Sequence, residues 1–425
     1  MFNTISNNST HTNLIKHVCG ILFIVFSFFY LYFLEGEFIS KAQYVFSKGL
    51  TNYSIFWGAV IITFVLRIIQ IPIQNFLKLS DKFYSFTYTP SILLLAMLCD
   101  LCSIVCDKES TYWSWLLFFI MFMVLCAILK LIKYLEKTIY FNNNSKSLSS
   151  TLFTNFLILF IAMLWCGSCH NANEVNLYEQ KVDRLISIND FDAALMVGRK
   201  SLNSNIRLTN LRMYALSKKG LLPEHLFDYP QYYGIDGLLC ISDTDSIFYR
   251  IDVIDICSYL GLKKINYIKS SEQLFNELIN IQQLSLDSLK DIEISDSINP
   301  NLLPPNNIQH NNHIKEEKRK IDDYLLCGLL LERNIDKFKT YINEVYGINV
   351  NSDSIVPITT LPKHYREALV MVYPNIDDTI MIKKYSEYLE LKNQYKDSVI
   401  YSNKTRREYG NTFWWYYDNP SITNK

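Results

Sequence analysis

The first 170 residues alternate between long apolar runs and short polar connections. A helix of about 20 apolar residues crosses a bilayer core of about 30 Å, and it satisfies its own backbone hydrogen bonds there. The pattern therefore predicts a bundle of about five transmembrane helices. The predicted spans cover residues 18–34, 55–73, 92–106, 113–129 and 152–166. The third is the weakest, because it is short and contains Asp100, and without it the bundle has four spans.

After residue 170 the apolar positions recur at helical spacing between charged residues. Leu177, Val182 and Leu185 lie on one face of a predicted helix, and a turn at residues 189–190 joins it to a second helix. A polar loop with several prolines is expected near residues 283–320. Helices are predicted at residues 177–188, 191–202, 207–219, 243–260, 263–281, 316–331, 334–346, 362–373 and 377–395.

Residues 189–195 resemble the turn of a tetratricopeptide repeat, in which Asp precedes an aromatic residue, then Ala and an aliphatic residue. A small side chain such as Ala194 lets two helices approach closely, although the Trp-Leu-Gly-Tyr pattern of the repeat's first helix is absent. The expected fold is therefore all-α. Residues 1–170 form a transmembrane helical bundle, and residues 171–425 form an α-solenoid-like, tetratricopeptide-like soluble domain.

The chain has 41 basic and 41 acidic residues, so nothing in its charge suggests nucleic acid as a partner. Residues 1–13 are polar and contain no Lys or Arg, which is unlike a cleaved signal peptide. Lysines gather on the side of the bundle that faces the N-terminus, and this bias predicts a cytoplasmic N-terminus. Five spans then place the soluble domain outside the cytoplasm, in the periplasm if the protein sits in a bacterial inner membrane. The lysines on the predicted cytoplasmic side are Lys16, Lys78, Lys82, Lys130, Lys133, Lys137 and Lys146, against Lys41, Lys48 and Lys108 on the other.

Two charged residues, Arg67 and Asp100, lie inside predicted spans. Charges within a membrane are costly and often belong to an ion or proton pathway. The interpretation we favour is structural: Arg67 extends toward the cytoplasmic face, or the two side chains pair.

Cys166, Cys169 and His170 form a C-x-x-C-H pattern, which is the attachment signature of c-type haem. The pattern ends a predicted span and does not sit in a haem-enclosing domain. A redox-active pair is a second possibility, and a fortuitous or structural pair is the interpretation we favour. We therefore expect no cofactor.

Other candidate ligands are also expected to be structural. Cys99, Cys102 and Cys106 share one helical face and offer soft ligands for Cu(I) or Zn, but small apolar packing is favoured. His310 and His313 lie in the predicted polar loop without an acidic partner, so no metal site is expected. Three further cysteines are expected to be buried thiols, although an oxidising compartment would permit one disulfide bridge: Cys240, Cys257 and Cys327.

His364, Arg366 and Glu367 fall together near a predicted helix start and are candidates for an acid–base group. The favoured interpretation is a solvated first turn with structural hydrogen bonds. The aromatic residues 413–417 are expected to cap the last helices, with a membrane-interface belt or a partner surface as alternatives. No nucleotide-binding, hydrolase or metalloprotease motif is present, so no catalytic residue is assigned.

Four segments resemble an uncharacterised family of Bacteroidota membrane proteins: residues 216–220, 323–331, 361–369 and 409–417. The resemblance implies a membrane bundle followed by a repeat-like helical region and brings no known activity. We expect a cell-envelope protein that contacts the bilayer through its bundle and a protein partner through its helical domain. The alternative is a membrane enzyme or transporter for an envelope or lipid-linked substrate.

Overall fold

The computed structural model describes residues 2–77, 79–106, 148–168, 173–238, 250–251, 253–260, 306–348, 358–373, 375–394 and 399–420, with single positions between 120 and 134 and at 276 and 279. This described part is helical and contains no β-sheet, which confirms the all-α class. The chain divides into two compact units, Met1–Gln180 and Lys181–Lys425, which are described separately. The hydrophobic pattern predicted this division after residue 170.

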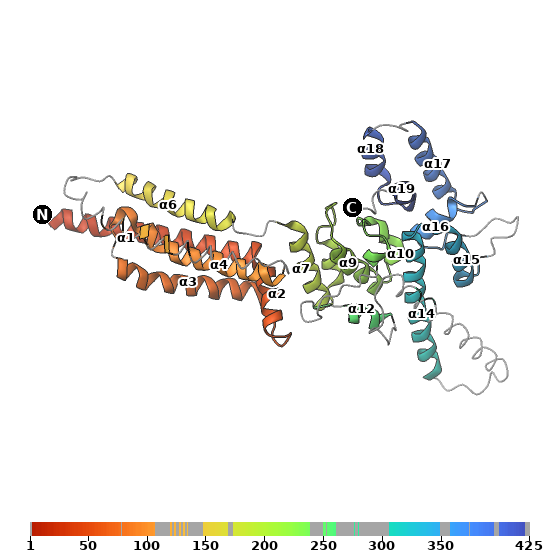
Figure 1. Cartoon of the computed structure of the whole chain (residues 1–425), viewed down its shortest axis with the longest axis horizontal. Coiled ribbons are helices and arrows are strands. Elements are labelled where there is room, and N and C mark those ends of the chain that lie inside the picture. The colour runs from red at the N-terminus through yellow and green to blue at the C-terminus, as the bar shows by residue number, and fades with distance from the viewer. Residues whose placement is uncertain are drawn as a thin grey trace. The chain divides into compact units, whose positions relative to one another are not determined.

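The first unit is a bundle of long apolar helices. Helices α1, α3, α4 and α6 run side by side in its red-to-yellow part (Figure 1). The α1 helix continues into a π-helical turn, η1, and a 3-10 segment, η2, precedes α4. The elements are α1 (Phe2–Phe29), η1 (Tyr30–Leu34), α2 (Gly36–Phe46), α3 (Ile55–Leu77), η2 (Asp81–Tyr88), α4 (Thr89–Cys106) and α6 (Leu148–Ser168).

Within the described residues of this unit, three helices are long and apolar enough to cross a membrane: Asn13–Leu34, Ile55–Leu77 and Ser149–Ser168. They coincide with the first, second and fifth predicted spans. The third predicted span forms part of α4, whose 18 residues extend about 27 Å. The fourth, residues 113–129, lies outside the described residues except for isolated helical positions. The number of five spans therefore stays a prediction.

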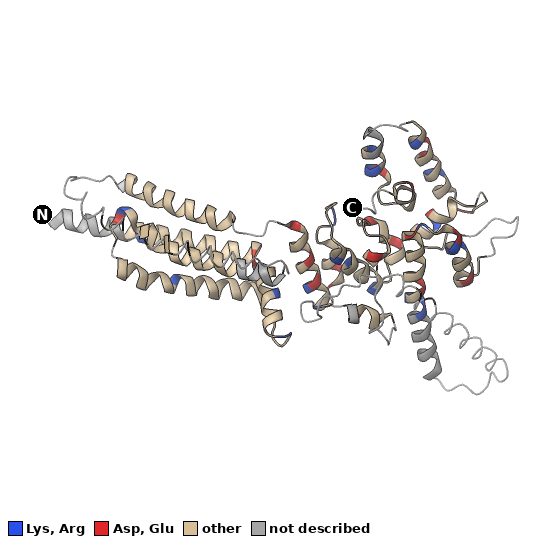
Figure 2. Cartoon of the chain, viewed as in Figure 1, with Lys and Arg blue, Asp and Glu red and all other residues tan. Residues whose placement is uncertain are grey.

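Apolar side chains cover the outside of these helices. Phe64, Phe153 and Ile161 are each more than half exposed, although water disfavours such surfaces. Charged residues are sparse over α1, α3, α4 and α6 (Figure 2). This distribution is compatible with a protein whose bundle faces lipid.

The α2 helix was not anticipated from the sequence, which assigned Lys41 to a short loop. It packs against α4, and Glu37 and Lys41 are buried there. Amphipathic burial of an 11-residue helix explains the difference, since its apolar face finds a neighbour that sequence spacing cannot reveal.

The second unit is made of shorter, charged helices. Their ends follow local rules: Asp190 and Asn334 accept hydrogen bonds from backbone N–H groups three residues on, and Gly347 ends a helix at φ +64°. The elements are α7 (Glu174–Ser187), α8 (Phe191–Met196), α9 (Ile206–Lys218), α10 (Leu222–His225), η3 (Leu226–Asp228), α11 (Ile235–Leu238), α12 (Val253–Tyr259), α14 (Asn306–Leu331), α15 (Ile335–Tyr346), α16 (Lys363–Val370), α17 (Thr379–Gln394), α18 (Val399–Tyr409) and α19 (Phe413–Asp418).

Several predicted boundaries need correction. The α8 helix ends at Met196 and not at residue 202, because Val197 is extended and Gly198 adopts φ +58°. The α14 helix begins at Asn306, directly after two prolines, so residues 306–320 of the predicted polar loop are helical. Predicted helix 263–281 lies outside the described residues apart from positions 276 and 279.

The α9 helix is the centre of the second unit's core. It is buried from Arg207 to Ser217 and contacts α8, α10, α11 and α14. A helix that is buried on all sides must satisfy its polar groups internally. The Nη2 atom of Arg212 donates to the carbonyl oxygens of Val197 and Gly198, which holds the end of α8 against the core.

Candidate functional site

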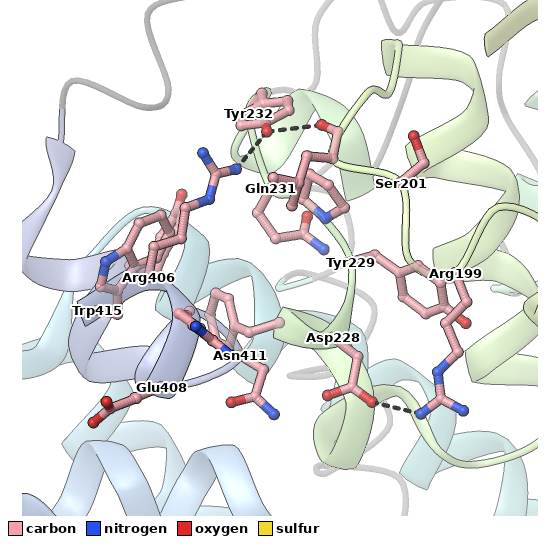
Figure 3. Close-up of a pocket in the computed structure, with 16 residues that line it drawn as sticks. Arg199, Ser201, Asp228, Tyr229, Gln231, Tyr232, Arg406, Glu408, Asn411 and Trp415 are labelled. Carbon is pink, nitrogen blue, oxygen red and sulfur yellow. Dashed lines mark hydrogen bonds and ion pairs between the residues drawn. The ribbon is translucent and has the colours of Figure 1, made fainter. Parts of the chain in front are cut away.

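A polar hollow of about 290 Å³ opens in the second unit (Figure 3). Three segments line it: the loop that follows α8, η3 with the chain after it, and the end of α18 with the start of α19. We call it the Gln231 hollow. Its lining residues are Arg199, Ser201, Leu202, Phe227, Asp228, Tyr229, Pro230, Gln231, Tyr232, Arg406, Arg407, Glu408, Gly410, Asn411, Trp415 and Tyr416.

Hydrogen bonds to the backbone of α8 and of the loop that follows it fix one wall of the hollow. Tyr229 donates its hydroxyl to the carbonyl oxygen of Leu195 at 2.7 Å, and Tyr232 donates to that of Leu202 at 2.8 Å. The Asp228 carboxylate contacts Arg199 at 3.3 Å and His225 Nδ1 at 2.9 Å. The wall is therefore held at three points, and Asp228 has its own cationic neighbours.

Arg406 forms the opposite wall, and Figure 3 shows it across the hollow from Arg199, with Gln231 and Asn411 between them. Its Nη2 donates to the Tyr232 hydroxyl at 2.7 Å, and its guanidinium carbon lies 5.4 Å from the centroid of the Trp415 ring. Arg406 forms no ion pair with any carboxylate of the described residues. A positive charge is thus held at the hollow by neutral partners.

Gln231 lies at the base of this hollow and is 3% exposed. Its Nε2 donates to the carbonyl oxygen of Leu226 at 2.6 Å, which defines the orientation of the amide. Its Oε1 is buried and accepts no hydrogen bond from the described residues. A buried acceptor without a donor is costly, so this oxygen is a candidate ligand contact.

His364 and Glu367 form a buried pair on α16. Their exposures are 0% and 1%, and His364 Nδ1 lies 2.8 Å from Glu367 Oε2. The same carboxylate oxygen accepts from the backbone N–H of Phe413 at 2.8 Å, and the Phe227 N–H donates to His364 Nε2 at 3.4 Å. The predicted structural hydrogen bonds are present, but the predicted solvation is wrong for this pair, because both side chains are buried and join three segments inside the core.

Arg366 does not complete an acid–base group with that pair. It contacts Asp378 Oδ2 at 2.8 Å, on the side of α16 that faces α17. A second hollow of about 560 Å³ lies there, lined in part by Lys363, Arg366 and Lys384. The structure thus brings together His364 and Glu367, two of the three predicted residues, and their hydrogen bonds position the chain at Phe413 and Phe227.

Comparison with known proteins now identifies the family of the chain. The family of unknown function named DUF6057 matches residues 104–267 and 300–419, which is more than half of the chain. The chain belongs to DUF6057. No curated protein and no solved structure matches it.

The DUF6057 match includes both walls of the Gln231 hollow. Arg199 and Gln231 fall in its first segment, and Arg406 and Trp415 fall in its second. The predicted resemblance to an uncharacterised family is therefore confirmed, and the family's description assigns no activity.

A second buried titratable group in the DUF6057 region is Asp323 on α14. Burial raises the pKa of Asp323 to about 6, although the Tyr365 hydroxyl donates to it at 3.1 Å and Arg319 lowers the pKa. Cys327 lies 3.8 Å from the same hydroxyl, and burial raises the pKa of this thiol well above its usual value. A protonated, buried thiol is a poor nucleophile, so this cluster has a structural character.

The cysteine candidates are only partly described. Cys166 is buried in α6, and its carbonyl oxygen accepts from the Tyr30 hydroxyl at 3.2 Å, while Cys169 and His170 lie outside the described residues. Cys99 is buried, and the side chains of Cys102 and Cys106 lie outside the description. Cys257 is buried like Cys327, and Cys240 is not described.

Metal ligation finds no support in the described part of the chain. No group of three His, Cys, Asp or Glu side chains there is arranged to hold a metal ion. His310 and His313 belong to the first turns of α14, and their side chains are outside the description.

Arg67 takes part in a polar network inside the first unit. Its Nη1 donates to Gln70 Oε1, and its guanidinium lies 5.6 Å from the centroid of the Tyr88 ring. Gln70 in turn donates to Thr87 Oγ1 at 2.8 Å. Arg67 therefore contacts the Gln70 amide and the face of the Tyr88 ring. The side chain of Asp100 lies outside the described residues.

A second part of this network joins α6 to η2. Asn155 is fully buried, accepts from the Ser85 N–H at 2.8 Å and donates to the Asp81 carbonyl oxygen at 2.7 Å. Hydrogen bonds of this kind hold membrane helices together where water is absent.

Proposed function

We propose that the chain is a membrane-anchored cell-envelope protein whose second unit binds a protein partner. The observation that carries this proposal is the Gln231 hollow, with the unneutralised charge of Arg406 and the unpartnered acceptor of Gln231. The buried Gln231 oxygen carries a free-energy cost in the isolated chain, and a ligand that donates a hydrogen bond to it offsets that cost. The Arg406 guanidinium offers a charge that an anionic group of the same ligand can pair with.

The first unit would anchor this module in the inner membrane through about five spans. Three helices of sufficient length and apolarity support the anchor, and the lysine bias favours a cytoplasmic N-terminus with the second unit in the periplasm. A C-terminal alkaline phosphatase fusion is then expected to be active and a C-terminal fluorescent fusion dark. The reverse pattern would contradict an odd number of spans.

A tetratricopeptide-like arrangement of the second unit belongs to the same proposal. The packing of α8 against α9 supports it, because Asp190 caps α8 and Ala194 is fully buried where α8 meets α9. Repeat-like helical pairs present extended surfaces to polypeptides, which suits an interaction module.

The experiment is site-specific photo-cross-linking in native membranes. A photoreactive residue replaces exposed Asn411 at the rim of the hollow, and the same residue replaces exposed Lys337 on α15 as a control. We expect a discrete cross-linked protein from position 411 that is absent from position 337. Equal, diffuse labelling at both positions would contradict a binding site at the hollow.

A membrane enzyme or transporter is the second candidate, and the polar network around Arg67 favours it. Transport sites are lined by intramembrane polar groups, and Gln70, Thr87 and Asn155 are all buried between helices. If this candidate holds, replacing Arg67 or Asp100 with Ala abolishes complementation of a deletion strain while cross-linking at position 411 persists. Unchanged complementation by the Arg67 variant, with cross-linking at position 411 intact, would favour the interaction module.

A further inference from the structure

We infer that the Gln231 hollow recognises the free C-terminal carboxylate of a polypeptide. This inference rests on the proposed function, since it specifies which part of a protein partner enters the hollow. The inference is carried by a cation, a hydrogen-bond acceptor and aromatic side chains that line the same hollow. Each of these three groups matches one feature of the C-terminal end of a polypeptide.

The cation matches the carboxylate. A guanidinium presents five donors in a plane and pairs with a carboxylate through two parallel hydrogen bonds. In the described part of the chain, one guanidinium nitrogen of Arg406 donates to the Tyr232 hydroxyl, and the guanidinium group lies over the Trp415 ring. These contacts hold the group in place without neutralising it, which is how a preorganised anion site is built. Exposed Arg407 adds a second positive charge beside it.

The acceptor matches the backbone N–H of the last residue. Gln231 Oε1 is buried, and Gln231 directly precedes Tyr232 in the chain, the residue whose hydroxyl accepts from Arg406. A terminal residue presents its carboxylate and its N–H on the same Cα, so both can be satisfied by groups that line one small hollow. The buried Gln231 amide therefore accepts a hydrogen bond from the terminal N–H. A small anion that has no N–H group would leave this acceptor unsatisfied.

The aromatic walls match an apolar terminal side chain. Phe227, Tyr229 and Trp415 line the hollow, and aromatic surfaces bury large apolar area on binding. The volume of about 290 Å³ lies at the lower limit of ligand pockets, roughly 300 to 1,000 Å³. That size suits the end of a chain and not an extended internal segment.

The acidic residues of the lining select against a phosphate dianion. Asp228 and Glu408 both line the hollow, so the local field favours a single negative charge accompanied by N–H donors. Capture of a chain terminus by such a combination is a known way of recognising peptides.

The experiment measures fluorescence anisotropy with the full chain in detergent micelles. The probe is a fluorescein-labelled pool of octapeptides that end in Leu, Ile, Val or Phe with a free carboxylate. The matched pool is identical but ends in a carboxamide. We expect the free-acid pool to bind about ten-fold or more tightly than the amide pool, as the loss of a charged hydrogen-bonding group predicts.

Variants locate the site. Arg406→Gln is expected to reduce binding of the free-acid pool to the level of the amide pool and to leave the amide pool unchanged. Arg406→Lys keeps the charge without the planar fork, so it is expected to retain part of the preference. Lys337→Gln removes the same charge from exposed α15 and is expected to change neither pool.

Three outcomes overturn the inference: equal binding of both pools, no binding of either, or full free-acid binding by Arg406→Gln with an unchanged melting temperature. The comparison of the pools on the unaltered chain needs no variant, so it decides the question even if Arg406→Gln fails to fold. If position 411 still cross-links a protein while the pools do not differ, the interaction module stands and recognition of the chain end falls.

Discussion

Arg333 holds Tyr416 against the end of α14: its guanidinium carbon lies 4.2 Å from the centroid of the tyrosine ring, and its Nη2 donates to the tyrosine carbonyl oxygen at 3.1 Å. The Tyr416 hydroxyl donates back to the carbonyl oxygen of Leu331 at 2.8 Å. The aromatic tail is thus docked at both its backbone and its side chain. Phe413, Trp414, Trp415 and Tyr416 are all buried, as a cap over the last helices requires.

Removing residues 409–425 is expected to lower the melting temperature of the second unit markedly. Each buried ring removes roughly 150 to 250 Å² from water, so losing four rings costs well over about 5 kcal/mol, comparable with the net stability of a domain. Calorimetry of the full and truncated chains in detergent measures this. Ile380→Ser on α17 is the control, because Ile380 is 69% exposed and its loss should change little. An unchanged melting temperature after truncation would show that the tail is not a cap.

Replacing Glu367 with Ala is expected to destabilise the second unit by about 3 kcal/mol. The change leaves the Phe413 N–H and the His364 ring without their buried acceptor. Denaturant unfolding followed by tryptophan fluorescence reports it through Trp414, which donates to the Glu367 carbonyl oxygen at 2.7 Å. Glu387→Ala is the matched control, since its ion pair with Lys383 is exposed and contributes at most about 0.5 kcal/mol. Equal effects of the two substitutions would refute a special role for the pair.

Asp323 predicts a pH dependence of stability between about pH 4 and 6. Its pKa in the folded chain is about 6, above the ordinary aspartate value of 3.8, so the folded state holds this proton more tightly than the unfolded state. The stabilisation is therefore complete below the unfolded pKa, is lost as the pH rises toward the folded pKa, and stays lost above it. The difference is of order 2–3 kcal/mol.

Asp323→Asn tests this dependence, because Asn is neutral at every pH and still accepts from Tyr365. We expect the variant to lose the decrease of stability between pH 4.5 and 7 that the unaltered chain shows in urea unfolding. A variant with the same slope as the unaltered chain would assign the dependence to other groups.

Asn155→Leu is expected to weaken the membrane bundle by about 1–2 kcal/mol. It removes the bonds from α6 to the backbone of η2 at Ser85 and Asp81 and leaves a buried N–H without an acceptor. Thermal unfolding in detergent, followed by accessibility of the bundle cysteines to a thiol reagent, measures the loss. Thr154→Ala is the control, because the Thr154 hydroxyl donates to the carbonyl oxygen of Ser150 in its own helix and, among the described residues, joins no other element. Identical melting of both variants would mean that Asn155 does not join the two elements.

Local rules were enough to predict much of the secondary structure. Gly220 at φ +66°, Gly347 at φ +64° and the capping residue Asn334 each act on neighbours within four residues, so sequence spacing alone locates these helix ends. The apolar lengths of the first, second and fifth predicted spans depend only on consecutive residues and the thickness of a bilayer, and three helices match them.

Only the tertiary structure decided the site. Arg406 bonds to Tyr232 across 174 positions of sequence, and Glu367 meets the Phe413 N–H across 46. No periodicity encodes these pairings, because they depend on how α16, α18 and α19 pack against the segment after η3. The same holds for α2, where Lys41 is buried on a helix that packs against α4. Helix ends are set by hydrogen bonds between near neighbours, whereas the hollow exists only after the chain has closed on itself.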